Sequence, residues 1–438
     1  MRIAIIGTGI AGNAAAYAIA TSTSHRLTVY ERDDRLGGHS ATVDVDYDGE
    51  RIAVDTGFIV FNEPNYENLT ALFAELGVET RASDMSFAVS ARGGRFEWCG
   101  RTTDVANGLF AQRRNLLSPG YMRMLIEVLR FNRVAVEDRK AGRLGSLSLD
   151  HYVTLRGFSR RFRDDYIVPM GAAIWSMSPA AMLAFPAESF IAFFQNHHLL
   201  QWERPVWRTV VGGSRSYVER ISAPFRDRIR LGAGVTRVVR GPEGVEVTDS
   251  TGQTDLFDEV VFASHSDQAL AMLADASEQE KAVLGAVRFR DNDVYLHRDL
   301  ALMPRRRRAW SAWNVMQNDD PQADLCVSYW MNALQGVDPA KPLFVTLNPP
   351  RPPAAEKNFG RFSYAHPQFD AAALAAQKAL PGVQGRNRVW FCGAWTGYGF
   401  HEDGIRSGLA VAEALGATVS WRRKAVVQES DALLEAAE

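Results

Sequence analysis

Short apolar runs alternate with small-residue segments along the chain. Four runs are too short for helices and match buried parallel strands, at residues 3–6, 27–30, 257–264 and 388–395. Two of them lead into helical patterns rich in small residues, at 14–20 and 405–415. Because strands and helices follow one another in this order, the pattern predicts an α/β fold built on a parallel sheet.

The first strand leads into a glycine-rich turn. Gly7, Gly9 and Gly12 have the spacing G-x-G-x-x-G, and Glu31 ends the second strand 19 positions after Gly12. In such a unit the first glycine makes the turn, the second admits a pyrophosphate and the third lets helix and strand pack closely. The helix N-terminus offers N–H groups to phosphates, and the acid accepts both ribose hydrogen bonds. The stretch therefore predicts FAD or NAD, and the acid argues against the 2′-phosphate of NADP.

A second glycine pair, Gly37-Gly38, follows the acid closely, and another strand ends at residues 54–58. This start resembles that of the flavin amine oxidase superfamily, which includes amine oxidases, protoporphyrinogen oxidases and phytoene-desaturase-like enzymes. The resemblance implies FAD and a set of contacts to it. Those residues are Gly7, Gly9, Ile10, Ala11, Gly12, Glu31, Arg32, Gly37, Gly38, His39, Thr56, Gly57, Val235, Gly393, Asp403, Gly404 and Ile405.

Near the other end, the strand at 388–395 enters a glycine turn and then the helix at 405–415. This unit is similar to the C-terminal flavin motif of the superfamily, in which a helix N-terminus points at the flavin. The resemblance implies that Gly404 and Ile405 supply N–H groups that stabilise a reduced flavin. Cys392 lies within the strand, so we expect FAD to be held non-covalently.

A chain of 438 residues is long enough for two closely packed domains. We expect a Rossmann-type FAD-binding domain with an interleaved α+β substrate domain. The FAD-binding parts are predicted at 1–84, 208–288 and 386–419, the substrate parts at 85–207 and 289–385, and a tail at 420–438.

Charge and cysteine content limit the classes of partner and metal site that we expect for this chain. The chain has 49 basic and 51 acidic residues, so no overall field favours nucleic acid. Its three cysteines lack metal or disulfide spacing, and no metal site is expected. We expect no signal peptide, and the sequence has no apolar run long enough to span a membrane. We expect a cytoplasmic protein, with peripheral contact at the inner membrane face as an alternative.

Two stretches of the sequence support peripheral membrane contact. Ser118-Pro119 predicts the start of a helix whose residues 121–136 mix apolar side chains with arginines. The helix could face the core with solvated arginines, or rest on lipid. Residues 305–308 are four arginines close to Trp310 and Trp313, which fits a solvated loop or an anionic head-group site.

The sequence indicates the reaction less clearly than it indicates the cofactor. Aligned with the superfamily, His401 falls where amine oxidases carry one wall of an aromatic cage, and the strand at 291–296 lacks the lysine those enzymes keep near the flavin. Both departures favour an apolar substrate over a cationic amine. His401 is the first candidate catalytic residue, with Glu402 close by and His198 as a candidate base. His197 and His265 are weaker candidates, and the aromatic stretch 189–200 is either core or a channel wall.

The chain as a whole resembles a bacterial subgroup of NAD/FAD-binding proteins, some of which are implicated in modifying unsaturated or methyl-branched fatty acyl chains. The resemblance implies an FAD-dependent desaturase or dehydrogenase that takes hydride from a lipophilic or phospholipid acyl substrate. An amine oxidase, a redox-neutral flavin isomerase and a non-catalytic FAD-binding protein are the alternatives. The electron acceptor, oxygen or another compound, stays open.

Overall fold

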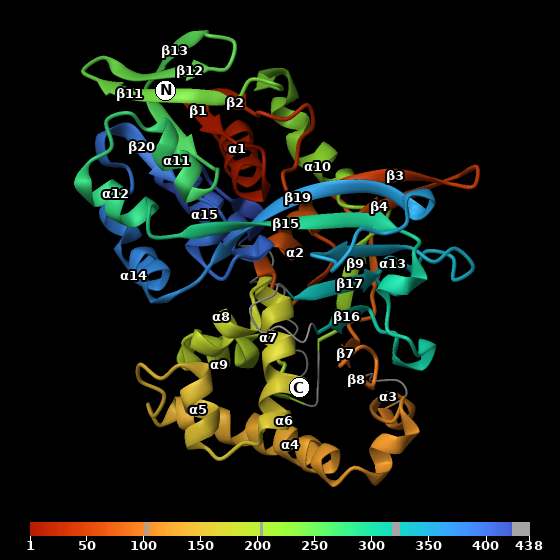
Figure 1. Ribbon diagram of the computed structural model, residues 1–438. Helices are drawn as coiled ribbons and strands as arrows, with labels where there is room; N and C mark the ends of the chain where they lie inside the picture. Colours follow the sequence, from red (N-terminus) through yellow and green to blue (C-terminus); the bar gives the residue numbers. More distant parts are fainter. Residues whose placement is uncertain (101–104, 202–204, 318–324, 423–438) are drawn as a thin grey trace, which may run out of the picture.

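The computed structural model describes residues 1–100, 105–201, 205–317 and 325–422. Its upper part in Figure 1 holds a five-stranded sheet in the order β10-β2-β1-β14-β20, in which every pairing is parallel. The strands are β1 (Arg2–Ile6), β2 (Arg26–Tyr30), β10 (Ile229–Arg230), β14 (Glu259–Phe262) and β20 (Val389–Phe391). The predicted α/β fold with a parallel sheet is confirmed.

Two helices from opposite ends of the chain pack together beside this sheet. They are α1 (Ile10–Ser22) and α15 (His401–Ala414), and both contribute to one apolar core with the strands. A Cβ at Gly408 would lie 2.1 Å from the carbonyl oxygen of Ala11, and one at Gly404 would lie 2.7 Å from Ile10 Cγ2. Only glycine permits this approach, so the N-termini of the two helices lie close together.

A seven-stranded sheet forms the middle of the molecule, in the order β19-β15-β18-β17-β16-β7-β8 (Figure 1). A hairpin that turns at residues 92–95 forms its β7–β8 edge. The strands are β7 (Phe87–Ala91), β8 (Phe96–Gly100), β15 (Arg288–His297), β16 (Trp313–Met316), β17 (Cys326–Trp330), β18 (Phe344–Leu347) and β19 (Asn358–Gln368). These strands fall close to the ranges predicted for a substrate domain, and the boundaries themselves stay a prediction.

Helices occupy the lower end of the molecule (Figure 1). Ser118 caps the longest of them as expected, because its hydroxyl accepts a hydrogen bond from the N–H of Tyr121. Pro179 begins a helix, where proline costs no hydrogen bond, and Pro169 lies just after the π-helical turn Arg163–Ile167. The helices are α3 (Val105–Leu109), α4 (Pro119–Lys140), α5 (Leu149–Leu155), α6 (Arg160–Phe162), α7 (Val168–Trp175), α8 (Pro179–Ala184) and α9 (Ala187–Asn196).

Smaller elements complete the fold. Three further sheets pair β3 (Thr42–Tyr47) with β4 (Glu50–Asp55), β9 (Trp207–Val210) with β5 (Phe61–Asn62) and β6 (Thr80–Ala82), and β12 (Gly244–Asp249) with β11 (Val235–Gly241) and β13 (Thr254–Phe257). The remaining helices are α2 (Glu67–Glu75), α10 (Arg215–Ser222), α11 (Ser266–Met272), α12 (Glu278–Leu284), α13 (Met331–Leu334) and α14 (Ala371–Ala379).

Residues 229–238 contain two strands that belong to different sheets, since β10 joins the parallel sheet while β11 joins the antiparallel one. The chain turns between them, where Gly232 and Ala233 donate hydrogen bonds to the carbonyl groups of Asp33 and Glu31. The C-terminal helix begins at His401, four residues before the predicted start. Most of the expected tail, from residue 423 onward, lies outside the described residues.

Among the described residues, every helix is too short or too polar to cross a bilayer.

Candidate cofactor and active site

The turn after β1 has the backbone geometry that a close-packed glycine loop requires. Gly7 has φ +106°, and a Cβ there would lie 2.8 Å from the carbonyl oxygen of Ala263. A Cβ at Gly12 would lie 2.0 Å from the carbonyl oxygen of Gly7. At Gly9, in contrast, a Cβ would meet nothing within 4 Å. Gly7 and Gly12 therefore serve packing, while Gly9 borders open space that a ligand can enter.

Helix α1 presents its N-terminus at this open space. Its N-cap is Gly9, which offers no side-chain cap, and its first turn contains no acid. The first-turn N–H groups, including those of Ile10 and Ala11, are the ones that a helix leaves without an internal partner. An anion with several oxygen atoms, such as a pyrophosphate, satisfies such a donor set and is favoured by the helix dipole.

Glu31 lies at the end of β2, next to the glycine turn. Its buried carboxylate accepts hydrogen bonds from the N–H and the hydroxyl of Thr8 and, at 3.1 Å, from the N–H of Asp33. A Cβ at Gly234 would lie 2.8 Å from Arg32 Cβ, so the segment that leads to Val235 packs against the same strand end. Glu31, Arg32 and Val235 thus share one edge of the parallel sheet.

A second layer of backbone covers the turn. A Cβ at Gly38 would lie 3.2 Å from the Cα of Gly9, and one at Gly57 would lie 2.1 Å from the carbonyl oxygen of His39. Thr56 is fixed behind them by a 2.7 Å hydrogen bond between its hydroxyl and that of Tyr364. Residues 37–39 therefore lie on the glycine turn and residues 56–57 pack on residue 39, as a long ligand running past the turn requires.

The N-terminus of α15 lies beside that of α1. Because the helix begins at His401, its free first-turn N–H groups belong to residues 401–403. The N–H of Gly404 instead donates to the carbonyl of Phe400 at 3.1 Å, which corrects the expected donor role of this glycine. Asp403 accepts from the N–H groups of Tyr398 and Phe400 and so shapes the turn that leads in from Gly393.

Histidines gather next to these two helix ends. The ring of His39 lies 5.2 Å from that of Tyr364, 5.6 Å from His366 and 6.2 Å from His265, measured between centroids. Burial lowers the pKa of His39 and of His265 to about 4 and the pKa of His366 to about 3. The three imidazoles are therefore uncharged at neutral pH.

His401 completes this cluster. Its ring stacks on Phe58 with 3.7 Å between centroids, and its Nε2 lies 3.0 Å from both Ser40 Oγ and the hydroxyl of Tyr217. Burial, and then the neighbouring His39, lower the pKa of His401 to about 3. We call His39, His265, His366 and His401 the histidine cluster.

A model of flavin containing amine oxidoreductases matches residues 10–287, which is more than half of the chain. The chain belongs to this family. A Mycobacterium tuberculosis protein named as a flavin-containing monoamine oxidase, AofH, is 26% identical over 260 residues, covering 58% of this chain and 54% of that protein. The chain thus spans about half the length of the curated relatives it matches.

Solved structures share the fold over nearly the whole chain. Putrescine oxidase bound to putrescine has a TM-score of 0.68 and 14% identity, covering 95% of this chain and 99% of the other. A fatty acid isomerase from P. acnes that produces CLA has a TM-score of 0.65 and 14% identity, with the same coverage. At such identities the likeness shows the fold alone.

The members of this family are FAD-dependent oxidoreductases, and FAD is the cofactor of this chain. The residues present fit it: Gly9 leaves room for a pyrophosphate, helix α1 supplies uncapped donors and Glu31 lies at the strand end where a ribose is held. Cys392 is fully buried within the core shared by α1 and α15, consistent with non-covalent attachment.

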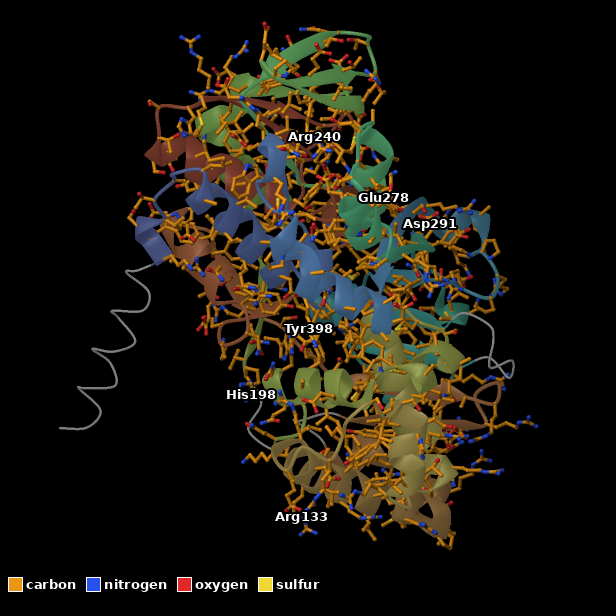
Figure 2. The ribbon with its side chains drawn as sticks, turned by 90° about the vertical axis from the view of Figure 1, so that its left-hand side faces the viewer. Arg133, His198, Arg240, Glu278, Asp291 and Tyr398 are labelled. Atoms are coloured by element: carbon orange, nitrogen blue, oxygen red, sulfur yellow. The ribbon has the colours of Figure 1, made fainter. Side chains whose placement is uncertain are left out.

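The structure separates the three candidate catalytic residues. His401 lies in the histidine cluster, whereas the carboxylate of Glu402 accepts hydrogen bonds from the N–H groups of Asn68 and Leu69 and so caps α2. His198 follows the end of α9, where its Nδ1 lies 2.9 Å from Gln201 Oε1 (Figure 2). Glu402 has a structural position, and a role of either residue in catalysis stays a prediction.

Sequence reasoning missed two residues of this region. Tyr364 and His366 lie on β19 and occupy alternate positions, so both point to the same side of the sheet. The signal was present in the alternating run Phe362, Tyr364, His366. This alternation did not indicate a functional site, because neither residue belongs to a glycine motif.

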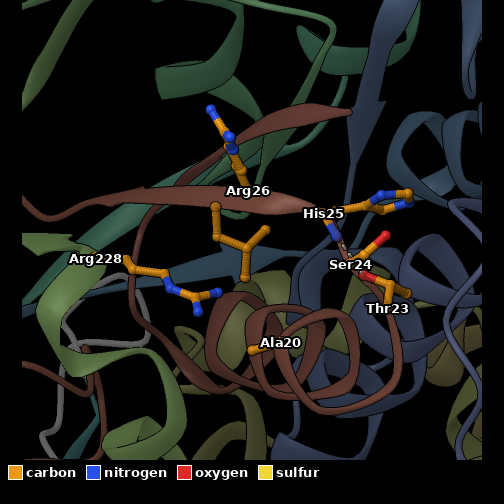
Figure 3. Close-up of a pocket in the computed structure, with 7 residues that line it drawn as sticks. Ala20, Thr23, Ser24, His25, Arg26 and Arg228 are labelled. Carbon is orange, nitrogen blue, oxygen red and sulfur yellow. Dashed lines mark hydrogen bonds between the residues drawn. The ribbon is translucent and has the colours of Figure 1, made fainter.

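The hollow drawn in Figure 3 has a different position. It is lined by the end of α1 and the start of β2, including His25 and Arg26, with Arg228 on its other side. Ligands of parallel sheets bind at the carboxyl ends of strands, and this hollow lies at the opposite end of β2. It is therefore separate from the site at Gly9 and Glu31.

Proposed function

We propose that this protein is an FAD-dependent oxidoreductase that desaturates a lipophilic substrate, a fatty acyl chain that is unsaturated or methyl-branched. Residues of the glycine turn, the second glycine pair and the N-terminus of α15 would hold the cofactor. The histidine cluster would lie where substrate meets it, because His39 adjoins Gly38 and His401 begins α15.

The observation that carries this proposal is the aromatic lining of the histidine cluster. All four imidazoles have pKa values lowered to about 3 or 4 by burial. Their neighbours are aromatic rings, including Phe58 against His401 and Phe289 stacked on His265 at 4.2 Å. A neutral, aromatic lining favours an apolar chain over a cationic amine, which loses hydration on entering such a site.

Bound FAD supplies an acceptor for a hydride from a substrate C–H bond. Desaturation also releases a proton from the adjacent carbon, which a group at the site must accept. His401 Nε2 is held by the hydroxyls of Ser40 and Tyr217, which also hydrogen-bond to each other. This closed triangle fixes the His401 ring, which would position the substrate chain against bound FAD. The acceptor that reoxidises the flavin is oxygen or another compound.

Two alternatives have support of their own. The family model and AofH favour an amine oxidase, although β15 contains no lysine and the histidine cluster is uncharged. The fatty acid isomerase among the structural neighbours favours a redox-neutral isomerisation of an acyl chain. An isomerase returns the hydride to its substrate and leaves no net reduced flavin.

Anaerobic titration of the yellow holoprotein tests the proposal. We expect phospholipids or fatty acids with unsaturated or methyl-branched chains to bleach the flavin absorbance, and saturated chains and amines such as putrescine to leave it unchanged. Bleaching by amines alone would overturn the proposal in favour of an amine oxidase. A shifted double bond in recovered lipid without bleaching would favour the isomerase.

A further inference from the structure

We propose that the lower end of the molecule, formed by residues 113–117, α4 and α5, docks on the surface of an anionic phospholipid bilayer. We call this region the docking face. The inference goes beyond the proposed function and does not depend on it, since a soluble substrate would leave the face unchanged.

Helix α4 buries acidic side chains on its inner face and exposes large apolar side chains on its outer face. Its inner face includes Glu127 and Asp138, both buried, while Met122, Ile126 and Leu129 are exposed. These three follow one another at spacings of four and three, so they form one stripe on the outer side of the helix. A helix that faces only water and a core places its acids outside and its large apolar residues inside.

The buried acids are satisfied by basic side chains and hydroxyls rather than by water. Glu127 accepts hydrogen bonds from Arg123 and Ser159, and Asp138 from Arg156 and Tyr152. The inner face thus buries its satisfied acids among core side chains such as Phe131, and the outer apolar stripe has no counterpart within the described chain. The two interpretations of residues 121–136 therefore apply to opposite faces of one helix.

Exposed apolar side chains concentrate at this end. Of the eleven large hydrophobic residues exposed in the described chain, six lie here. Leu117 is 88% exposed, Ile126 65% and Leu155 66%. Leu155 lies beside α4, because the next residue, Arg156, accepts a hydrogen bond from Arg130 through its carbonyl. Such a concentration marks a surface that is covered in use.

Arginines border the apolar stripe. Arg113, Arg114, Arg123, Arg130 and Arg133 are all exposed, and Figure 2 shows Arg133 at the lower end of the molecule. The exposed acid of α4 is Glu137, whose carboxylate lies 3.9 Å from Arg133. The docking face therefore carries net positive charge although the whole chain has a net charge of −2. Arginine beside exposed leucine and isoleucine is typical of surfaces that bind anionic lipid.

A basic hollow adjoins the stripe. Its volume is about 340 Å³, and its lining includes Arg92, Arg95, Arg114 and Arg161. Asp165 pairs with Arg92 and Arg161 at 2.8 and 3.2 Å, so this single buried carboxylate offsets only part of the charge of the four arginines. The hollow lies next to Leu116 and Leu117 in sequence, through Arg114. A lipid phosphate in this hollow would leave its acyl chains beside the apolar stripe.

The other basic stretch lacks these features. Trp310 is 5% exposed and its indole N–H donates to the carbonyl of Pro304, while Arg306 pairs with the buried Glu97 at 2.8 Å. Residues 305–308 therefore present no aromatic anchor to lipid, and the docking face is the better candidate for membrane contact.

Flotation of the full-length holoprotein with vesicles tests the proposal. We expect it to rise with phosphatidylglycerol vesicles at low salt, to stay behind with phosphatidylcholine vesicles, and to release as salt screens the arginines. The variant Leu117→Ser/Ile126→Ser/Leu155→Ser and the variant Arg113→Glu/Arg114→Glu should each weaken binding about tenfold or more. Retained yellow colour shows that each variant is folded.

The chain offers matched controls. Leu231 and Leu300 are 46% and 49% exposed and lie outside the docking face, so Leu231→Ser/Leu300→Ser should bind as the wild type does. Equal loss in this control, equal binding by all variants, or no flotation of the wild type would each overturn the proposal. A wild-type dimer that Ile126→Ser converts to a monomer would also overturn it, because the face would then be a protein interface. Flavin reduction by detergent-dispersed acyl substrate is a separate readout of the proposed function.

Discussion

The two ends of this molecule are built on different kinds of contact. At the cofactor end, backbone meets backbone: Gly12 on Gly7, Gly57 on His39 and Gly408 on Ala11 are closer than any side chain would permit. At the helical end, α4 is held by side chains, such as Glu127 against Ser159. Backbone contacts restrict a position to glycine, so they can be recognised in the sequence as a motif. Side-chain contacts tolerate several residue types and can be recognised only as a periodic pattern of polar and apolar positions.

The strongest test of this contrast is the contact between α1 and α15. Gly408→Ala places a Cβ 2.1 Å from the carbonyl oxygen of Ala11, and rigid backbone cannot yield cheaply. We expect a loss of about 3 kcal/mol in the free energy of unfolding and loss of bound FAD.

Gly120→Ala is the control at the helical end, where the nearest atom to the new Cβ is the mobile Nη1 of Arg161 at 3.4 Å. It should unfold within about 0.5 kcal/mol of the wild type in denaturant titration. Similar losses in both variants would break the distinction between the two ends.

The next test asks whether Glu31 recognises the ribose. Glu31→Gln removes the charge from an acceptor at the end of β2, and charge-assisted hydrogen bonds contribute about 1.5–3 kcal/mol. We expect the FAD dissociation constant to rise about 100-fold, measured by fluorescence of released flavin. Asp34→Asn, three residues along and exposed, should bind FAD as the wild type does. An unchanged constant for Glu31→Gln would remove the ribose contact.

His401 joins cofactor binding to chemistry. His401→Phe keeps an aromatic ring on Phe58 but loses the Nε2 held by Ser40 and Tyr217. We expect flavin reduction to slow about 100-fold, the scale of a misplaced reacting group, with FAD still bound. Stopped-flow absorbance measures this, with His198→Phe as the comparison. If only His198→Phe slowed reduction, the reacting centre would lie near α9 instead.

A smaller effect concerns pH. Burial lowers the pKa of His366 to about 3, below its ordinary value, so the folded state takes up fewer protons than the unfolded state as pH falls. Stability should therefore fall from about pH 7 to about pH 5, with this histidine contributing about 2 kcal/mol. His366→Gln should flatten that dependence in denaturant titrations, and His151→Gln on the exposed surface of α5 should not. Equal slopes in the two variants would contradict the burial of the histidine cluster.

The sequence predicted much of this architecture. The parallel strands, the glycine turn and the cap at Ser118 could all be predicted, because each depends on local patterns. We predicted the start of α15 four residues too late, because His401-Glu402-Asp403 is a polar run of the kind that is typical of loops. The partners of His401 could not be predicted, since Ser40 and Tyr217 come from distant segments without a motif.

The central claim is that this chain removes two hydrogens from a lipophilic acyl substrate with FAD as the acceptor. Mass spectrometry of lipid after aerobic incubation with the holoprotein measures this most directly, with His401→Phe in parallel. We predict an acyl product lighter by two hydrogen atoms that accumulates far more slowly with the variant. Lipid of unchanged mass and unchanged double-bond positions, with an amine consumed under the same conditions, would contradict the account.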